Sequence, residues 1–273
     1  MKVLVLGGTG AMGVYLVDEL LHMGREVVVT TRSKHEADKR EGLTYLVGNA
    51  REEDFLTQAL MGAHFDAVVD FMARPAAEFA RYRMLLLSST DQYIFLSSYR
   101  VYADSPYITE ESPRLLDVCE EKDYLATNEY ALDKARCEDM LRESGETNWT
   151  IVRPSVTFSR ARFQLGTLEA EDWLWRWQQG LEVPLSPEML DKQATLTWGG
   201  MPLGLSRISS AQKLQWGKLS TSARPSITPG AACSRRTRTF CPSRSSCGRS
   251  VRRTISASRP TTTSSMTVCT TVC

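Results

Sequence analysis

The stretch Gly7-Gly8-Thr9-Gly10-Ala11-Met12-Gly13 decides the fold expected of this chain. A short apolar run, Val3-Leu4-Val5-Leu6, leads directly into it, and a helical pattern follows from Val14 to Leu21. A strand that ends in glycines and opens a helix brings free backbone N–H groups and the positive end of the helix to one point, which suits a diphosphate group. The sequence therefore predicts a dinucleotide-binding turn, whose contacting residues are Gly7, Thr9, Gly10, Ala11, Met12 and Gly13.

Physical reasons support glycine at three positions of this turn, namely Gly7, Gly10 and Gly13. A tight turn needs a residue that tolerates positive φ. Close approach of a diphosphate needs a position without Cβ, and packing of the helix on the strand excludes a side chain as well. A plain strand–turn–helix that binds nothing is the alternative interpretation of the same pattern.

Short apolar runs alternate with helical patterns over the first 180 or so residues. The predicted strands are Lys2–Leu6, Glu26–Thr31, Leu43–Val47, Ala67–Phe71, Tyr93–Ser97 and Trp149–Val152. The predicted helices are Ala11–Met23, Glu53–Met61, Ala76–Leu87, Asn128–Glu143 and Leu168–Gln179. Short apolar strands separated by helices are typical of a parallel sheet that is covered on both faces. We therefore expect an α/β fold with a doubly wound parallel sheet of the Rossmann type, which binds ligands at the carboxyl ends of its strands.

The net charge of +1 hides a strong asymmetry along the chain. Residues 192–273 carry three Lys, ten Arg and no acidic residue, whereas residues 1–191 have a net charge of −12. We expect residues 1–160 to form the dinucleotide-binding domain and residues 161–200 to begin a substrate lobe that this chain leaves incomplete. Residues 201–273 form an anomalous tail that is rich in Ser, Thr, Arg and Cys.

Two interpretations of this tail remain open. One is a disordered basic segment. The other is a shifted reading frame, because codons allowed for residues 216–232 also encode, one base earlier, the protein-like string GEAVNVCPAEHHTWGS. On this hypothesis the coding DNA continues an ordinary acidic domain after about Gly200.

The ends of the next strands indicate which cofactor the turn would hold. An acidic residue after the second strand favours NAD, but this chain has Thr31 and Arg32, and the guanidinium could bind a 2′-phosphate. These residues favour NADP over NAD as the cofactor. The alternative is that Arg32 is a solvated charge in a loop. Asn49 could pair with the adenine edge. Phe71, Met72 and Ala73 should border the nicotinamide.

A tyrosine and a lysine one helical turn apart, Tyr130 and Lys134, predict the chemistry. Residues i and i+4 share one face of a helix. A tyrosine has an unperturbed pKa near ~10, and a neighbouring ammonium group would favour its phenolate form. The fifth predicted strand ends in Ser97-Ser98, and a serine hydroxyl there could hold the substrate oxygen while Tyr130 moves its proton. We therefore expect Tyr130, Lys134 and a serine of this pair to be catalytic.

Four motifs resemble the extended short-chain dehydrogenase/reductase superfamily, in particular the NAD-dependent epimerase/dehydratase family. They are GGTGAMG at 7–13, FLSSYRVY at 95–102, YALDK at 130–134 and IVRPS at 151–155. The resemblance covers residues 1 to about 200. It implies that Ser98 is catalytic, that Tyr130 is the acid/base, and that Lys134 binds the ribose and lowers the pKa of the tyrosine. It also implies a nucleotide-sugar substrate.

Departures from the family pattern restrict this expectation. Ala103 replaces a frequent glycine, Thr31 and Asn49 replace usual acids, and Tyr99-Arg100 stands where a 4,6-dehydratase would have an Asp-Glu pair. We therefore expect an NAD(P)-dependent oxidoreductase or epimerase that acts by hydride transfer at a carbinol carbon. A non-catalytic dinucleotide sensor or RNA-associated protein on the same fold is the alternative, and a basic nucleic-acid-binding tail on an enzyme is a third.

Other expectations concern location and partners. The apolar runs are too short to span a membrane, and no secretory signal precedes the first strand, so we expect a cytoplasmic protein. No Cys-x-x-Cys motif occurs, and we interpret His22, His35 and His64 as structural or exposed, so no metal site is expected. The expected partner is a small molecule, with no nucleic acid and no membrane, and a homodimer is left open.

Overall fold

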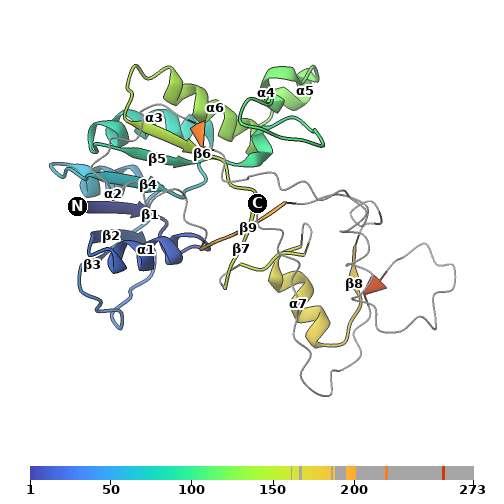
Figure 1. Ribbon diagram of the computed structural model, residues 1–273, viewed down its shortest axis with the longest axis horizontal. Coiled ribbons are helices and arrows are strands. Elements are labelled where there is room, and N and C mark those ends of the chain that lie inside the picture. Colours follow the sequence, from blue (N-terminus) through green and yellow to red (C-terminus); the bar gives the residue numbers. More distant parts are fainter. Residues whose placement is uncertain are drawn as a thin grey trace.

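A parallel sheet forms the centre of the molecule (Figure 1). The computed structural model describes residues 1–160, 162–165, 168–185, 187 and 195–200, together with the backbone of 219–220 and 254–255. Seven strands make up the sheet in the order β10-β6-β5-β4-β1-β2-β3. Their bounds are β1 Lys2–Leu6, β2 Glu26–Thr31, β3 Leu43–Val47, β4 Ala67–Asp70, β5 Tyr93–Leu96, β6 Trp149–Val152 and β10 Leu219–Ser220. All neighbouring strands in the sheet run parallel.

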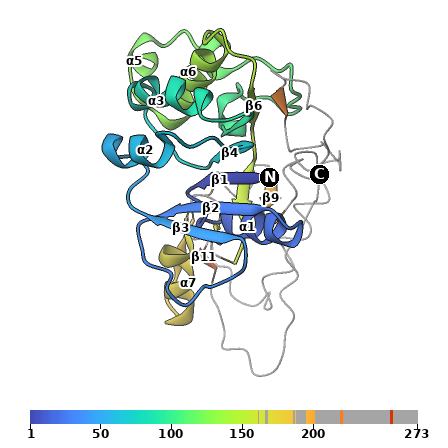
Figure 2. The same cartoon turned by 90° about the vertical axis from the view of Figure 1, so that its left-hand side faces the viewer.

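Helices flank the sheet on both faces. Their bounds are α1 Gly13–His22, α2 Glu53–Leu60, α3 Ala76–Ser88, α4 Leu115–Val118, α5 Lys122–Leu125, α6 Tyr130–Arg142 and α7 Ala170–Gln178. Figure 2 shows α2, α3 and α6 on one side of the sheet and α1 on the other. The single helical turn η1, Tyr99–Val101, follows β5 directly. This arrangement is the doubly wound fold that the alternating sequence pattern predicts.

The burial of β1 explains why its last four residues, Val3 to Leu6, are all apolar. Leu4 and Leu6 pack with α2, α3 and α6, whereas Val3 and Val5 pack with α1. Successive side chains of a strand point to opposite faces, so a strand that is covered on both faces needs apolar residues at every position. The same alternation divides β4 and β5 between the two clusters.

Most predicted elements agree with the structure to within two residues at each end. The helix predicted from Ala11 begins at Gly13, because the glycine turn extends that far. The helix predicted from Asn128 begins at Tyr130, because Glu129 has an extended backbone and its side chain caps the helix by accepting the Ala131 N–H. The last residues of two predicted strands, Phe71 and Ser97, lie in loops.

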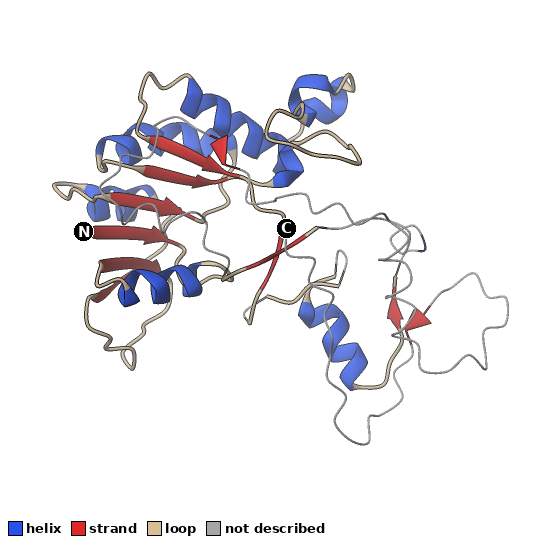
Figure 3. Cartoon of the chain, viewed as in Figure 1, coloured by secondary structure: helices blue, strands red, loops and turns tan. Residues whose placement is uncertain are grey.

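A second group of elements lies beyond the carboxyl ends of the sheet strands (Figure 3). Strand β7, Val156–Phe158, pairs in parallel with β9, Leu196–Trp198, and β8, Val183–Pro184, pairs antiparallel with β11, Thr254–Ile255. None of these strands was predicted, since two or three residues are too few to show a period.

The second group contacts the start of α1. The rings of Tyr15 and Trp198 meet edge to face at 5.5 Å, and a Cβ built on Gly199 would lie 2.6 Å from the carbonyl oxygen of Ala11. Glycine at 199 therefore lets β9 approach the dinucleotide turn.

Apart from the backbone of β10 and β11, the tail predicted as disordered or frame-shifted lies outside the described residues. Among the helices that the structure describes, none combines the length and the apolar character needed to cross a bilayer.

Candidate functional site

The glycine turn joins β1 to α1 at the carboxyl edge of the sheet. Gly7 has a φ of +75°, and its N–H donates to the Oγ1 of Thr30 at 3.1 Å. A Cβ on Gly7 would lie 3.1 Å from the sulfur of Met72, and a Cβ on Gly13 would lie 2.6 Å from backbone atoms of Gly8. The positive φ and the close helix–strand packing therefore both occur in the predicted turn.

Gly8 is a structurally required residue to which sequence reasoning gave no role. A Cβ there would lie 2.9 Å from Val29 and 3.0 Å from Val5. Gly8 and Gly13 thus meet backbone to backbone, and this contact sets how closely α1 approaches the sheet. The doubled glycine at 7–8 was the signal that could have identified it.

The loop after β4, which contains Phe71, Met72 and Ala73, lies beside the turn. The Phe71 N–H donates to the carbonyl of Leu6 at 3.0 Å. Asp70 holds this loop in place, because its buried carboxylate accepts the Met72 N–H at 2.8 Å and pairs with Arg74 at 2.5 Å. The carboxylate of Asp70 is therefore held within the core.

Arg32 and Asn49 lie after β2 and β3, at the same edge of the sheet. Arg32 is exposed and has no ion-pair partner among the described residues. The side chain of Asn49 is engaged locally, since its oxygen accepts the Arg51 N–H at 3.1 Å and its amide donates to Glu52 at 3.1 Å. To contact an adenine, the side-chain amide of Asn49 would have to give up its hydrogen bond to Glu52.

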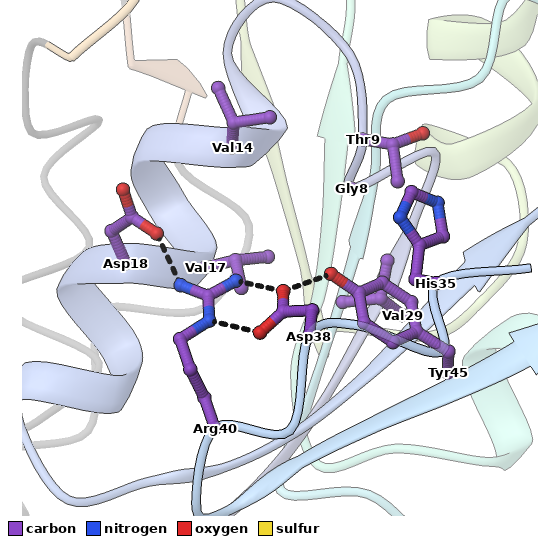
Figure 4. Close-up of a pocket in the computed structure, with 10 residues that line it drawn as sticks. All are labelled: Gly8, Thr9, Val14, Val17, Asp18, Val29, His35, Asp38, Arg40 and Tyr45. Atoms are coloured by element: carbon purple, nitrogen blue, oxygen red, sulfur yellow. Dashed lines mark hydrogen bonds and ion pairs between the residues drawn. The ribbon is translucent and has the colours of Figure 1, made fainter.

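A cavity of about 230 Å³ lies next to the glycine turn (Figure 4). It is bounded by α1, the end of β2, β3 and the loop between those strands, and its lining residues are Gly8, Thr9, Val14, Val17, Asp18, Val29, His35, Asp38, Arg40 and Tyr45. Of the predicted cofactor residues, Thr9 lies in this cavity. The predicted catalytic residues do not line it.

Three of the lining side chains are charged and bind one another, as Figure 4 shows for Asp18, Asp38 and Arg40. Arg40 binds both carboxylate oxygens of Asp38 at 2.8 Å and reaches Asp18 of α1 at 2.5 Å. Tyr45 also donates to Asp38, and these hydrogen bonds lower the pKa of Asp38 to about 2. Arg40 therefore ties the loop after β2 to α1.

Ser98 is placed by the end of β5. The N–H groups of Ser97 and Tyr99 donate to the carbonyls of Val152 and Pro154 at 2.8 and 2.9 Å, so backbone bonds hold the residues on both sides of Ser98. The Ser98 side chain is buried and accepts the Arg100 N–H at 3.2 Å. It also lies close to the phenol of Tyr130, where it favours the phenolate form. Ser98 and Tyr130, two of the predicted catalytic residues, are therefore neighbours in the structure.

Tyr130 is the first residue of α6, and its side chain is 39% exposed. Partial burial raises the pKa of its phenol above the usual value of 10.0. The nearby Ser98 hydroxyl and the positive charges of Arg100 and Arg162 act in the opposite direction. The protein alone therefore keeps Tyr130 in its protonated form at neutral pH.

Lys134 lies one turn further along α6 and is buried. Its ammonium donates to the carbonyl of Leu96 at 2.6 Å and to the carbonyl of Met72 at 3.2 Å, and it lies 4.5 Å from the centre of the Phe95 ring. Burial lowers the pKa of Lys134 to about 8. Lys134 thus joins the carboxyl ends of β4 and β5.

A buried ion pair holds α6 against β6. Arg153, at the end of β6, donates to both carboxylate oxygens of Glu138, and both side chains are almost fully buried. The guanidinium also lies 4.5 Å from the centre of the Tyr102 ring. Tyr130 and Lys134 are therefore on a helix whose position relative to the sheet is fixed.

The residues at this edge fit a nicotinamide dinucleotide. Gly7 and Gly13 allow the tight packing of the turn against Met72 and Gly8, and the helix α1 begins without a side-chain cap at Met12. The buried Ser97 hydroxyl has no hydrogen-bond partner within the described part of the chain. These features lie at the start of α1 and at the end of β5, on the sheet edge where Ser98 and Tyr130 also lie.

Comparison with known proteins agrees with this fit. Residues 7–172 match the family model described as NAD(P)H-binding, which covers more than half of the chain. The family therefore gives the class of cofactor as NAD or NADP. The preference for NADP stays a prediction.

Two curated proteins are related at the level of sequence. The chain is 28% identical over 198 residues to the chloroplast stem-loop binding protein of 41 kDa b from Arabidopsis thaliana, across 67% of this chain and 48% of that protein. It is 29% identical over 178 residues to 2′-dehydrokanamycin reductase from Streptomyces kanamyceticus. This match covers 64% of this chain and 48% of that protein. The matched region thus spans about half the length of each curated relative.

The solved structures that are most similar include epimerases and 4,6-dehydratases. One is dTDP-glucose 4,6-dehydratase from Bacillus anthracis in complex with NAD, with a TM-score of 0.64 and 14% identity, covering 88% of this chain and 81% of that one. At this identity the likeness concerns the fold. The chain belongs to the NAD(P)H-binding family and has the fold of the extended short-chain dehydrogenases/reductases of the epimerase/dehydratase type.

Proposed function

We propose that the protein is an NAD(P)-dependent oxidoreductase or epimerase that oxidises or reduces a carbinol carbon. The observation that carries this proposal is that the Ser98 hydroxyl lies close to the phenol of Tyr130 and favours its phenolate form, at the same sheet edge as the glycine turn. A proton donor and acceptor beside a dinucleotide turn is the arrangement that alcohol oxidation needs.

The roles of the side chains follow from their surroundings. The Ser98 hydroxyl holds the substrate oxygen, and the phenol oxygen of Tyr130 takes the hydroxyl proton during oxidation or returns it during reduction. The bound cofactor supplies a hydride acceptor or donor. Lys134 holds the loop after β4 next to the end of β5 by donating hydrogen bonds to a carbonyl of each. Its positive charge also lies at the edge where Tyr130 must lose a proton.

A nucleotide sugar is the substrate class that we propose. Support comes from the name of the Bacillus anthracis enzyme, which acts on dTDP-glucose, and from the fold that the two proteins share. Tyr99 and Arg100 follow Ser98 in place of the acidic pair expected for 4,6-dehydration. The 2′-dehydrokanamycin reductase supports simple reduction of a sugar ketone as the narrower alternative.

The Tyr130→Phe variant tests the role of the phenol. Turnover of any substrate found among UDP- and dTDP-hexoses should fall by about 10²–10⁴-fold, the usual contribution of a general acid or base. NADH and NADPH binding, followed by the fluorescence of the reduced cofactor, should stay unchanged. A variant that retains full turnover would remove Tyr130 from the mechanism.

A second function is supported by one relative. The Arabidopsis protein is named as a stem-loop binding protein, and this name supports a dinucleotide-binding protein associated with nucleic acid as the second function. Electrophoretic mobility shift with a stem-loop RNA separates the two functions. Salt-dependent binding that persists in the Tyr130→Phe variant, together with no turnover of any sugar nucleotide, would favour the second function.

A further inference from the structure

Two loops at the carboxyl edge of the sheet are not joined by the sheet itself. The loop after β3 contains Asn49, Ala50 and Arg51, and the loop after β4 contains Phe71 and Met72. Strands β3 and β4 are not neighbours, because β1 and β2 lie between them. The hydrogen bonds between adjacent strands therefore do not fix one loop relative to the other.

Arg74 connects the two loops through its two terminal nitrogens. One nitrogen pairs with the Asp70 carboxylate at 2.5 Å, and the other donates to the carbonyl of Ala50 at 2.9 Å. Asp70 in turn accepts the N–H of Met72 at 2.8 Å. Because a planar guanidinium presents its donors at fixed angles, this bridge sets how the loop after β3 lies relative to the loop after β4.

The bridge is buried. The side chains of Asp70 and Arg74 are 0% and 2% exposed. Tyr93 of β5 donates a further hydrogen bond to Asp70 at 2.8 Å, and burial raises the pKa of this phenol, so it keeps its proton. A buried ion pair contributes little net stability, because the cost of removing both charges from water offsets their attraction. The distinctive contribution of this pair is therefore its fixed geometry.

The start of α3 holds the loop after β3 at two more points. Glu78 pairs with Arg51 at 2.8 Å, and the phenol of Tyr82 donates to the carbonyl of Arg51 at 3.2 Å. Arg74, Glu78 and Tyr82 follow one another at intervals of four residues, and residues at this spacing share one face of a helix. One side of this segment therefore holds the loop after β3, while Asp70 holds the loop after β4.

We propose that Arg74 is a positioning residue that makes the two halves of the dinucleotide site depend on each other, through its simultaneous hold on Asp70 and Ala50. The inference rests on the proposed function for the placement of the cofactor, with adenosine beside the loop after β3 and the pyridine ring beside the loop after β4. Coupling between two parts of a site is reciprocal. A bound adenosine group therefore also stabilises the arrangement of the loop that receives the pyridine ring.

The experiment measures the binding of half-cofactors, which carry adenosine but no pyridine ring. Adenosine 5′-diphosphate represents this half of NAD, and adenosine 2′,5′-bisphosphate represents this half of NADP. Calorimetric titration of the full chain gives the dissociation constants of both compounds and of NADH and NADPH. The variants are Asp70→Asn and Arg74→Lys. The lysine keeps a positive charge beside Asp70, but its single ammonium replaces the two nitrogens of the bridge.

Asp70→Asn and Arg74→Lys should each weaken the binding of the tighter half-cofactor by about tenfold, the usual effect of losing one charge-assisted hydrogen bond. The loss in Asp70→Asn is the decisive result, because Asp70 lies on the pyridine side and the half-cofactor has no pyridine ring. Unchanged half-cofactor affinity in both variants would overturn the role of Arg74. An unmodified protein that binds none of the four compounds would overturn it as well.

Met72→Ala controls for a second route between the two halves. A Cβ on Gly7 would lie 3.1 Å from the Met72 sulfur, so a displaced loop after β4 also touches the glycine turn directly. Met72→Ala removes this sulfur and leaves Asp70 and Arg74 in place. It should weaken the binding of the whole cofactor and leave half-cofactor affinity unchanged. A loss of half-cofactor affinity equal to that in Asp70→Asn would assign the coupling to the turn instead of Arg74.

Glu138→Gln is the matched control for the loss of a buried ion pair. Glu138 pairs with Arg153 between α6 and β6, away from both loops. This variant should be less stable toward urea but should bind the half-cofactors as the unmodified protein does. Equal losses of half-cofactor affinity in Glu138→Gln and Asp70→Asn would show general destabilisation and refute the coupling.

Circular dichroism shows whether each variant is folded. If Asp70→Asn and Arg74→Lys do not fold, the double variant Asp70→Asn/Arg74→Gln takes their place, because two amides then replace the pair and no buried charge is left without a partner. The same tenfold loss of half-cofactor affinity is expected, and its absence would overturn the proposal.

This test separates the inference from the proposed function. A loss of half-cofactor affinity in Asp70→Asn, with no turnover of sugar nucleotides by the unmodified protein, would support the coupling and count against the enzyme. Turnover that requires Tyr130, together with unchanged half-cofactor affinity in Asp70→Asn and Arg74→Lys, would support the enzyme and refute the role of Arg74.

Discussion

The two ends of the candidate site are built by different means. At the glycine end, between β1 and α1, the site depends on residues that have no side chain. Gly7, Gly8 and Gly13 let neighbouring atoms approach closely there. At the tyrosine end, between β5 and α6, it depends on side chains whose hydrogen bonds and charges are specific. Substitutions at the first end should therefore act by steric overlap, and substitutions at the second end by changing pKa values and rates.

Gly13→Val should have the largest effect at the glycine end. Its Cβ would lie 2.6 Å from rigid backbone atoms of Gly8, so either α1 or the turn must move. We expect a loss of about 3 kcal/mol or more in the free energy of unfolding, beyond the usual cost of overpacking, and loss of NADPH binding. Urea unfolding and cofactor fluorescence measure the two effects.

Gly24→Ala is the matched control for this steric argument. Gly24 has a φ of +67°, and a Cβ there would meet nothing within 4 Å. The control should lose only about 1 kcal/mol from backbone strain and should bind cofactor normally. Equal losses in Gly13→Val and Gly24→Ala would show that packing at the turn is unimportant.

The pH dependence of stability should reveal Lys134 at the tyrosine end. Its pKa in the folded protein is about 8, below the ordinary value of 10.5, so the unfolded chain binds more protons between these two pH values. The free energy of unfolding of the unmodified protein should therefore rise, relative to Lys134→Met, as the pH increases from 8 to 10.5. The total change is at most about 3 kcal/mol.

Urea unfolding of both proteins at several pH values measures this difference. Lys134→Met should show no corresponding increase, because methionine does not titrate. A constant difference between the two proteins across this interval would mean that Lys134 keeps an ordinary pKa in spite of its burial.

Arg32→Ala should have the smallest effect. If Arg32 binds the 2′-phosphate of NADP, the affinity for NADPH should fall about tenfold, the usual effect of losing one charge-assisted hydrogen bond. The affinity for NADH should stay the same, and fluorescence titration measures both. Equal affinities of the variant and the unmodified protein for NADPH would identify Arg32 as a solvated loop charge.

Local sequence patterns predicted the central sheet because its strands are short, apolar and buried on both faces. Lys2–Leu6, Glu26–Thr31, Leu43–Val47 and Trp149–Val152 have the same bounds in the sequence pattern and in the structure. The helices α4 and α5 were not predicted, because each has four residues and none of these is buried. A single exposed turn leaves no periodic signal.

Sequence patterns named the residues of the candidate site but not the contacts that they make. The spacing of Tyr130 and Lys134 placed both on one helix, yet Lys134 contacts carbonyls of Leu96 and Met72, which lie 38 and 62 residues away in the sequence. The position of Arg100 over Tyr130 depends likewise on the ion pair with Glu129. No sequence pattern encodes such contacts, because they arise from the packing of α6 on the sheet.

A crystal structure of the chain with NADH or NADPH bound would test the central claim most directly. The account predicts that the diphosphate lies at the N–H groups of the turn from Gly7 to Gly13, and that the pyridine ring lies beside Met72 and within reach of Ser98 and Tyr130. A dinucleotide bound elsewhere, or with its pyridine ring turned away from Tyr130, would contradict it.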